Sequence, residues 1–234
     1  MAASHDAVPA EGGASVDRPT PAFITLSVVY GALLIVSNIT VTKLVQVGPF
    51  LITAAFFTYP AVYVVSDIMT EVYGYRLSMK AIWANFIAQA VVTFFLGVAV
   101  RLPGIDPAVQ EAMKTLFSTT WRIVLGSLAA YWIGDWLNSL ILSKLKVVQK
   151  GKWFFLRAMA SSVPAHFIDT ALFTTLAFAG IWGSGDIAKN VISEGLLASV
   201  YELAVFPITF FAVRAWKRRE GLDVYDRGIR YRPF

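Results

Sequence analysis

Polar residues recur at helical spacing inside two long apolar segments of the chain. The segments are Gly-Asp-Trp-Leu-Asn-Ser at 134–139 and Ala-His-Phe-Ile-Asp-Thr at 165–170. Because positions i and i+3 share one face of a helix, Asp135 pairs with Asn138 and His166 pairs with Asp169. Polar breaks at matching places in two hydrophobic segments are typical of a transporter binding site. We therefore predict that both pairs, with Thr170, face a shared cavity; hydrogen bonding between helices without a ligand is the alternative.

Other polar residues also interrupt apolar segments, where an ionisable group costs at least about 2.5 to 3.5 kcal/mol. Asp67 and Glu71 are four residues apart and share a helical face near Tyr73. We predict that these three act in coupling or gating; the alternative is that the acids pair with nearby basic residues or cap helix ends. Three further candidates for the binding site are Asn38, Arg122 and Glu202.

Composition excludes several kinds of chemistry. The chain has no cysteine and only two histidines, so cysteine-ligated or histidine-rich metal sites are not expected, and we predict no metal and no cofactor. No Gly-rich Walker loop occurs, so the chain itself should not hydrolyse ATP. Ser161 or Ser162 with His166 and Asp169 would suit an intramembrane hydrolase, but no nucleophile elbow is present. We predict a protein that is not an enzyme and binds no nucleic acid.

The elements that carry these residues are predicted to be transmembrane helices. The chain has 234 residues, of which 57% are hydrophobic and only 15% are charged, against about 25% in soluble domains. Its apolar runs reach the roughly 20 residues that cross a bilayer. We predict an all-α integral membrane protein, a six-helix bundle. The helices are expected at about 22–45, 50–73, 78–101, 116–143, 154–181 and 188–214.

The segments around this bundle are also assigned from composition. Residues 1–20 lack an apolar run and are rich in Ala, Gly, Pro and Ser, which predicts a disordered tail. Residues 21–216 form the transmembrane domain, and residues 217–234 form a basic tail. The connection at 102–115 is expected to be a short interfacial helix or a lid, with a plain connector as the alternative.

The basic residues predict the orientation of the bundle. Fifteen lysines and arginines fall at the termini and in the second and fourth connections, and five fall on the opposite side. Cytoplasmic connections carry an excess of positive charge. We therefore expect both termini in the cytoplasm.

Motifs along the chain resemble those of the queuosine-precursor transporter family, also called the vitamin uptake transporter family. The matching residues are Phe57-Thr58-Tyr59-Pro60, the run from Val65 to Tyr75, Arg122 to Ser127, Asn138-Ser139, Leu145-Lys146, Leu156-Arg157, Asp169-Thr170 and Phe173. Each motif is weak alone, but their order and spacing agree from about Pro21 to Trp216. Ala165-His166 departs from the pattern, since relatives tend to have Gly followed by Glu or Gln there.

The resemblance implies a function and a fold. It implies a six-helix protein of the bacterial inner membrane, similar to the substrate-binding subunits of energy-coupling-factor importers, that imports 7-cyano-7-deazaguanine and/or 7-aminomethyl-7-deazaguanine. For such a planar heterocycle, Asp169, Asp135 or Glu202 would accept hydrogen bonds from N1 and the exocyclic amine. Arg122, Asn38 or Asn138 would donate to O6.

Energy coupling stays open at this point. Import is either proton-coupled through Asp67, Glu71, His166 or Asp169, or facilitated. The alternative function is a substrate-binding subunit that needs separate ATPase and coupling subunits. The partners expected are the ligand and the lipid bilayer, and a homodimer is compatible with the sequence.

Overall fold

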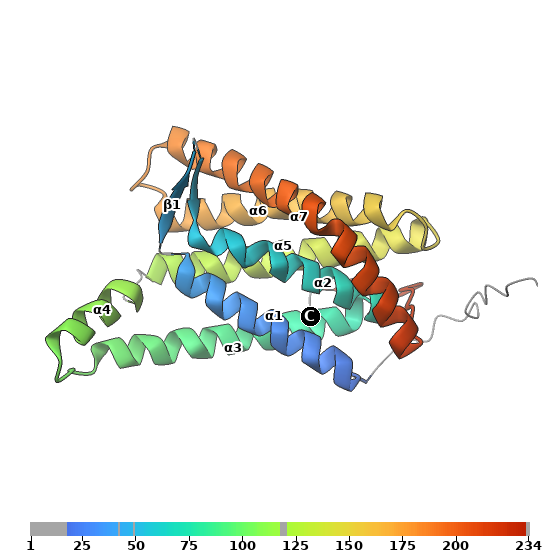
Figure 1. The fold of residues 1–234 in the computed structure, drawn as a ribbon, viewed down its shortest axis with the longest axis horizontal. Helices are drawn as coiled ribbons and strands as arrows, with labels where there is room; N and C mark the ends of the chain where they lie inside the picture. The colour runs from blue at the N-terminus through green and yellow to red at the C-terminus, as the bar shows by residue number, and fades with distance from the viewer. Residues whose placement is uncertain (1–17, 42, 49, 118–120, 233–234) are drawn as a thin grey trace, which may run out of the picture.

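A computed structural model describes residues 18–41, 43–48, 50–117 and 121–232 of the chain, which form a bundle of long helices (Figure 1). The elements in chain order are α1 (Pro21–Thr40), β1 (Leu44–Val47), β2 (Phe50–Thr53), the 3-10 helix η1 (Ala54–Phe57), α2 (Tyr59–Tyr73), α3 (Tyr75–Arg101), α4 (Pro107–Phe117), α5 (Trp121–Val148), α6 (Phe154–Phe178) and α7 (Ser184–Glu220). The all-α class predicted from the sequence is confirmed.

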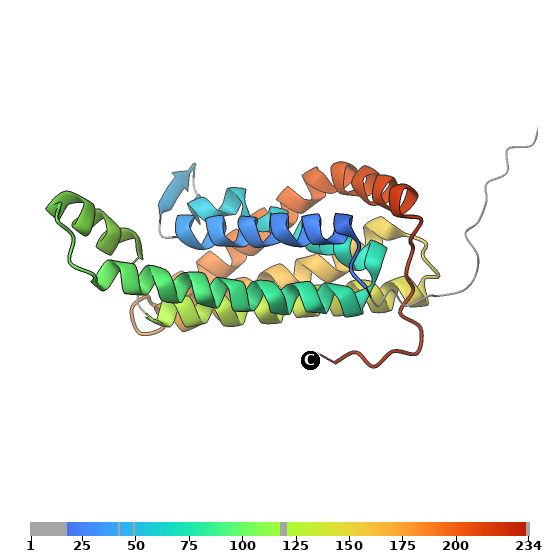
Figure 2. The same cartoon turned by 90° about the horizontal axis from the view of Figure 1, so that it is seen from below.

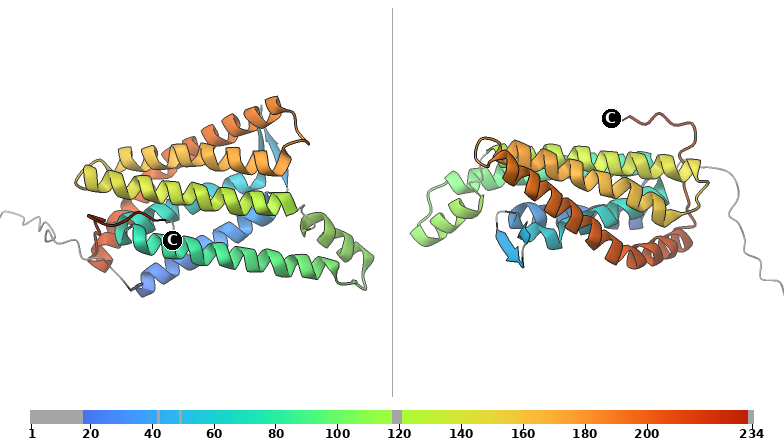
Figure 3. Two further views of the ribbon diagram at one scale, coloured as in Figure 1. Left: turned by 180° about the vertical axis from the view of Figure 1, so that it is seen from behind. Right: turned by 90° about the horizontal axis from the view of Figure 1, so that it is seen from above.

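The helices other than α4 lie in two layers. One layer holds α1, α2 and α7, and the other holds α3, α5 and α6, as the side view in Figure 2 shows. Helix α1 packs over α3, α2 over α5, and α7 over α6. Helices α2 and α5 are therefore the middle helices of their layers, and both have neighbours on three sides (Figure 3).

The two ends of the bundle differ in what they carry (Figure 1). One end holds the antiparallel hairpin of β1 and β2, helix α4 and the connection from α6 to α7; we call it the hairpin end. The other end holds the start of α1, the α2–α3 junction, the α5–α6 connection and the end of α7; we call it the terminal end. The segment after α7 runs back from the terminal end along the bundle (Figure 2).

Polarity in this bundle is reversed relative to a water-soluble protein. Large apolar side chains such as Val28, Phe94 and Phe211 are exposed on its outer faces, whereas ionisable side chains such as Asp67 and Arg157 are buried. Helices α1, α3 and α7 are long and apolar enough to cross a membrane. Helices α5 and α6 carry several buried polar residues, among them Asn138 and Asp169.

The hairpin of β1 and β2 lies where the sequence predicted the ends of two helices and the connection between them, so the predicted helix boundaries are wrong there. Residues 44–45 were expected at the end of one helix and residues 50–53 at the start of the next, but 44–47 and 50–53 pair as strands in the register Val47 to Phe50. The segment is apolar enough for either structure, and hydropathy alone does not distinguish them over so short a run. The β-branched Val45, Val47 and Ile52 favour strands. Gly48, with φ +57°, adopts the left-handed conformation that a tight hairpin turn requires.

Helices α2 and α3 are separated by Gly74 alone. Gly74 has φ +84°, and a Cβ there would lie 2.7 Å from Cγ1 of Val224, so a side chain does not fit. The carboxylate of Asp226 accepts a hydrogen bond from the backbone N–H of Tyr75 at 2.7 Å, which caps the start of α3. The chain after α7 is thus fastened to the α2–α3 junction.

The remaining boundaries differ from the prediction by shorter stretches. Residues 107–117 form helix α4, which agrees with the predicted short helix in the connection and not with a plain connector. The carboxylate of Asp106 accepts a hydrogen bond from the backbone N–H of Ala108 at 2.8 Å, and this caps α4. Helix α7 continues to Glu220, so the start of the predicted tail at 217 is helical. The predicted disorder of the N-terminal tail falls mostly on residues 1–17, which lie outside the described residues.

Candidate functional site

The two polar segments of α5 and α6 face each other because of Gly134. A Cβ at Gly134 would lie 2.9 Å from Cβ of Asp169 and 2.5 Å from the hydroxyl of Tyr63. The missing side chain lets the two helices approach closely at the level of these segments. The predicted proximity of the two segments is therefore found, but their polar side chains have different partners.

Asp135 is directed toward α1 and α2. Its carboxylate accepts hydrogen bonds from the hydroxyl of Ser66, at 2.5 Å, and from the hydroxyl of Tyr30. The hydroxyl of Tyr30 also lies 2.9 Å from that of Tyr131. Asp135 is 2% exposed and is not among the residues that line the cavity described below. Its contacts hold α1, α2 and α5 together.

Asn138 joins α5 to α2 and α6. Its amide donates to Oδ1 of Asp67 at 2.7 Å and accepts from the hydroxyl of Ser162 at 3.2 Å. These three side chains are buried in the middle of the bundle. The hydroxyl of Ser162 is bonded to Asn138 and that of Ser161 to the carbonyl of Ala158, so neither serine of the hydrolase alternative is bonded to His166.

His166 and Glu202 form a buried pair between α6 and α7. Nε2 of His166 lies 2.9 Å from Oε2 of Glu202. The imidazole also packs edge-on against the ring of Tyr63, with centroids 4.4 Å apart. The pair is fully enclosed by protein, at 2% and 3% exposure.

A cavity opens toward the hairpin end between α1, α2, α5, α6 and α7. It measures about 500 Å³ when the solvent space at its mouth is included. Its lining residues are Ser37, Asn38, Val41, Thr53, Ala55, Tyr59, Ser127, Ala130, Asp169, Thr170, Phe173 and Glu194. We call it the hairpin-end cavity.

Asp169 is the buried acid of this cavity. Its side chain is 5% exposed, and its Oδ1 has no hydrogen-bond partner among the described residues. The hydroxyl of Tyr59 is a close neighbour of the carboxylate. A buried acceptor without a partner costs about 1–3 kcal/mol, more when it is charged, so a hydrogen-bond donor at this oxygen would be favourable.

Asn38 and Ser127 form the wall of the cavity between α1 and α5. The hydroxyl of Ser127 donates to Oδ1 of Asn38, and the amide of Asn38 donates to the carbonyl of Leu34 at 3.1 Å. Both residues also line a second cavity of about 590 Å³, measured in the same way, next to α3 and the end of α4. The position of α4 beside this second cavity suits the predicted lid.

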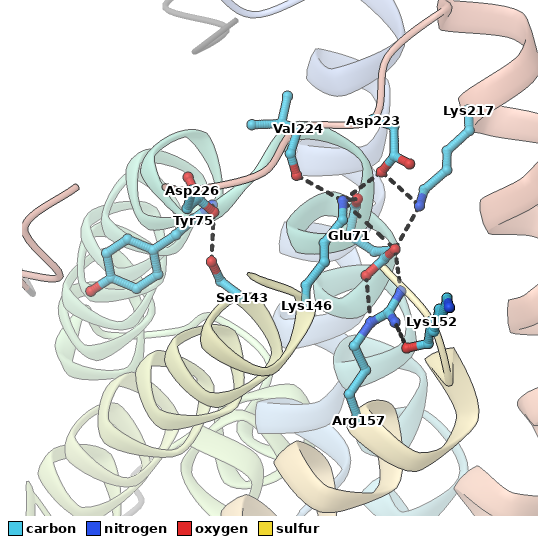
Figure 4. A network of polar contacts seen from close by, with 10 residues as sticks. All are labelled: Glu71, Tyr75, Ser143, Lys146, Lys152, Arg157, Lys217, Asp223, Val224 and Asp226. Carbon is cyan, nitrogen blue, oxygen red and sulfur yellow. Dashed lines mark hydrogen bonds and ion pairs between the residues drawn. The ribbon is translucent and has the colours of Figure 1, made fainter. Parts of the chain in front are cut away.

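The terminal end is closed by a cluster of buried ions around Glu71 (Figure 4). Oε1 of Glu71 lies 2.6 Å from Nη2 of Arg157, 2.6 Å from Nζ of Lys217 and 3.7 Å from Nζ of Lys146. Asp223 binds Lys146 at 2.6 Å and Lys217 at 2.8 Å. The alternative interpretation paired Glu71 with nearby Arg76 or Lys80, whereas its partners in the structure come from α5, α6 and α7.

The ion cluster extends into the chain after α7. Burial opposes ionisation of Asp223, but the ammonium groups of Lys146 and Lys217 outweigh it and hold the pKa of this carboxyl below its ordinary value. The ammonium of Lys146 also donates to the carbonyl of Val224 at 2.7 Å, and Ser143 donates to Asp226 at 2.6 Å. The segment from Asp223 to Asp226 thus covers the terminal ends of α2 and α5.

Residues 53–212 match the model of a protein family described as "Putative vitamin uptake transporter". The chain belongs to this family. The transporter is also 27% identical over 178 residues, covering 75% of its own chain and 78% of the other, to a protein of Bacillus subtilis (strain 168) named "Probable queuosine precursor transporter". No solved structure gives a significant match to it. The family predicted from the sequence is confirmed, and the protein is a transporter rather than an enzyme.

In the structure of the transporter, the predicted site residues lie in separate groups. Asn38, Asp169 and Thr170 line the hairpin-end cavity. The other predicted residues whose side chains are described, Asp135, Asn138, His166 and Glu202, lie outside its lining and are bonded to other side chains. The hairpin-end cavity is therefore lined by only part of the set that the sequence predicted to share one chamber. Arg122 lies near the start of α5 at the hairpin end, but its side chain lies outside the described residues.

The predicted coupling and gating residues also separate. Asp67 belongs to the buried cluster with Asn138, and Glu71 is the centre of the ion cluster at the terminal end. Tyr73 packs edge-on against Phe23 with ring centroids 5.0 Å apart, inside the apolar core of the transporter. Tyr73 therefore contributes to packing beside α1.

Two further polar residues of the cavity, Glu194 and Tyr59, were not among the site residues predicted from the sequence. Glu194 accepts a hydrogen bond from the backbone N–H of Thr53 at 3.1 Å, which ties the hairpin to α7. Tyr59 is placed beside Asp169 because α2 begins there and not at residue 50. Both placements depend on the hairpin, which the sequence did not predict. An acid in an apolar segment was the available signal for Glu194.

Proposed function

We propose that this transporter imports a queuosine precursor, 7-cyano-7-deazaguanine and/or 7-aminomethyl-7-deazaguanine, and binds it in the hairpin-end cavity. The observation that carries the proposal is the buried Oδ1 of Asp169, which has no hydrogen-bond partner among the described residues and belongs to an acid that lines the hairpin-end cavity. The name of the Bacillus subtilis relative supports the substrate class.

The chemistry of the cavity matches the edge of a deazaguanine. N1 and the exocyclic amine of such a base are donors, and a carboxylate accepts from both in a charge-assisted pair. The Asn38 amide has a second N–H available for O6, since only one is used by Leu34. The rings of Tyr59 and Phe173 line the cavity and offer flat surfaces for the heterocycle.

Six membrane spans are proposed, namely every helix except α4. Helices α5 and α6 have 28 and 25 residues, so at about 1.5 Å per residue they exceed the roughly 30 Å thickness of the hydrocarbon core. Helix α2 has 15 residues and is extended by η1 toward the hairpin end. The basic connections lie at the terminal end, which supports a cytoplasmic location for it in a bacterial inner membrane.

The path from the cavity to the cytoplasm is proposed to follow the buried polar faces of α2, α5 and α6. On α6, Asp169, His166, Ser162 and Arg157 are all buried and are spaced about one helical turn apart. Their partners on α2, α5 and α7 complete a polar core between the cavity and the ion cluster. With the cavity open toward the hairpin end and the ion cluster intact, the transporter is in an outward-facing state.

Transport then requires the ion cluster around Glu71 to separate. Asp67, Glu71, His166 and Asp169 are the groups whose protonation would couple a proton to this change. Protonation of Glu71, for example, would remove the charge that holds Arg157 and Lys217 together. The alternative is facilitated entry, in which the same change takes place without proton transfer.

Uptake by purified protein in liposomes tests the proposed function. We expect saturable uptake of radiolabelled 7-aminomethyl-7-deazaguanine without ATP or partner proteins, with competition by 7-cyano-7-deazaguanine and little competition by adenine. Adenine should compete poorly because its edge leaves Asp169 unpaired. A protonophore distinguishes proton coupling from facilitated entry. Binding without uptake would instead favour a substrate-binding subunit that needs an ATPase module, and absence of both would reject the substrate class.

A further inference from the structure

A groove lies at the terminal end between the start of α6 and the second half of α7. It measures about 1,130 Å³, counted with the solvent space that it includes. Its lining residues are Glu71, Gly151, Phe154, Arg157, Phe210, Val213, Arg214, Lys217, Arg218, Gly221, Leu222 and Asp223. We call it the basic groove. It is at the opposite end of the bundle from the hairpin-end cavity and is separate from it.

The groove has an excess of positive charge. Four of its lining residues are cationic and two are anionic, so its charge is +2. Arg157 and Lys217 neutralise Glu71 and Asp223 from within the protein. Arg214 and Arg218 are exposed and form no ion pair with a described acid, so they supply the excess. Because they are four residues apart, they lie on the same face of α7.

The same groove has an apolar wall. Phe154, Phe210 and Val213 line it beside the basic residues, and Phe210 is 38% exposed. The guanidinium of Arg157 stacks over the ring of Phe154 at 5.1 Å, so the polar and apolar parts of the groove adjoin directly. Phe211, on the outer face of α7, is 67% exposed, which places the outside of the groove against lipid.

We infer that the basic groove binds the phosphodiester headgroup of an anionic phospholipid, with an acyl chain against Phe154, Phe210 and Val213. A bilayer supplies an amphipathic anion at this depth, since α7 leaves its apolar stretch between Phe211 and Arg214. Two unpaired guanidinium groups present several N–H donors to phosphate oxygens. A soluble phosphate would bind the two arginines but would make no contact with the apolar wall of the groove.

Lipid retention by the full-length purified protein tests this inference. The protein is titrated in mixed micelles with phosphatidylglycerol or with phosphatidylcholine of the same acyl chains, and bound lipid is counted by native mass spectrometry. We expect phosphatidylglycerol to bind preferentially. The double variant Arg214→Gln/Arg218→Gln should bind it about 30-fold more weakly. Each arginine near an anionic surface contributes about 1 kcal/mol, or about fivefold in affinity.

A matched control removes two charges from the same end of the chain. Arg219→Gln/Arg230→Gln alters two exposed arginines that do not line the groove, and its affinity for phosphatidylglycerol should stay within about twofold of the unmodified protein because salt screens distant charges. Equal losses in both double variants would indicate diffuse attraction and overturn the site. Equal thermal stabilisation by inorganic phosphate and by phosphatidylglycerol would overturn the lipid as occupant.

Discussion

Replacing Asp169 with asparagine is expected to abolish measurable uptake of a deazaguanine while the bundle stays folded. Asparagine has nearly the same shape, but it turns one carboxylate oxygen into a donor that meets the donor edge of the base. A hydrogen bond to a charged group contributes about 1.5–3 kcal/mol, so the affinity should fall about 10- to 100-fold. Ligand affinity in detergent and initial rates of uptake in liposomes measure this effect.

The control for this substitution is Asp186→Asn. Asp186 is an exposed acid in the first turn of α7, also at the hairpin end, and it does not line the cavity. Its replacement should leave affinity and uptake unchanged. If Asp169→Asn transports at the rate of the unmodified protein, the substrate is not bound by this carboxylate.

Replacing Glu71 with glutamine is expected to destabilise the terminal end strongly. Glu71 is the common partner of Lys146, Arg157 and Lys217, and the loss of its charge leaves two of these cations, Lys146 and Arg157, almost fully buried with less compensation. Breaking a buried ion pair by removing one partner costs about 3–5 kcal/mol. Thermal unfolding in detergent should show a clear fall in melting temperature, and proteolysis after Gly221 should become faster.

Glu111→Gln provides the comparison for Glu71. Glu111 forms an ion pair with Lys114 on α4 at 3.8 Å, but its side chain is 74% exposed. Exposed pairs contribute about 0–1 kcal/mol, so this variant should melt at the same temperature as the unmodified protein. Equal melting temperatures for both variants would mean that the ion cluster does not hold the terminal end together.

The positions of most helices followed from the sequence because long apolar runs fix where a chain crosses a bilayer. Helix α6 begins at Phe154, as predicted, since the basic connection before it ends the preceding run. The hairpin at 44–53 was not predicted because its residues are as apolar as those of a helix, and strand pairing depends on a turn that hydropathy does not detect. The placement of Tyr59 in the cavity was missed for the same reason.

The site was predicted only in part because helical spacing assigns residues to a face but does not identify the neighbouring helix. Positions i and i+3 differ by about 60° around a helix, which is enough for Asp135 to meet Ser66 while Asn138 meets Asp67. Asp169 stays in the cavity because Gly134 and Tyr63 occupy the space beside it. Such pairings depend on the packing of α2 against both helices.

The most direct test of the central claim is ligand protection of a cysteine placed in the hairpin-end cavity. The chain has no cysteine, so Ser127→Cys introduces a single thiol into the cavity lining, and Thr115→Cys introduces one on the exposed face of α4. Saturating 7-aminomethyl-7-deazaguanine should slow labelling of Ser127→Cys by a membrane-impermeant maleimide and leave labelling of Thr115→Cys unchanged. Equal labelling of Ser127→Cys with and without the ligand, in protein that still binds it, would contradict the account.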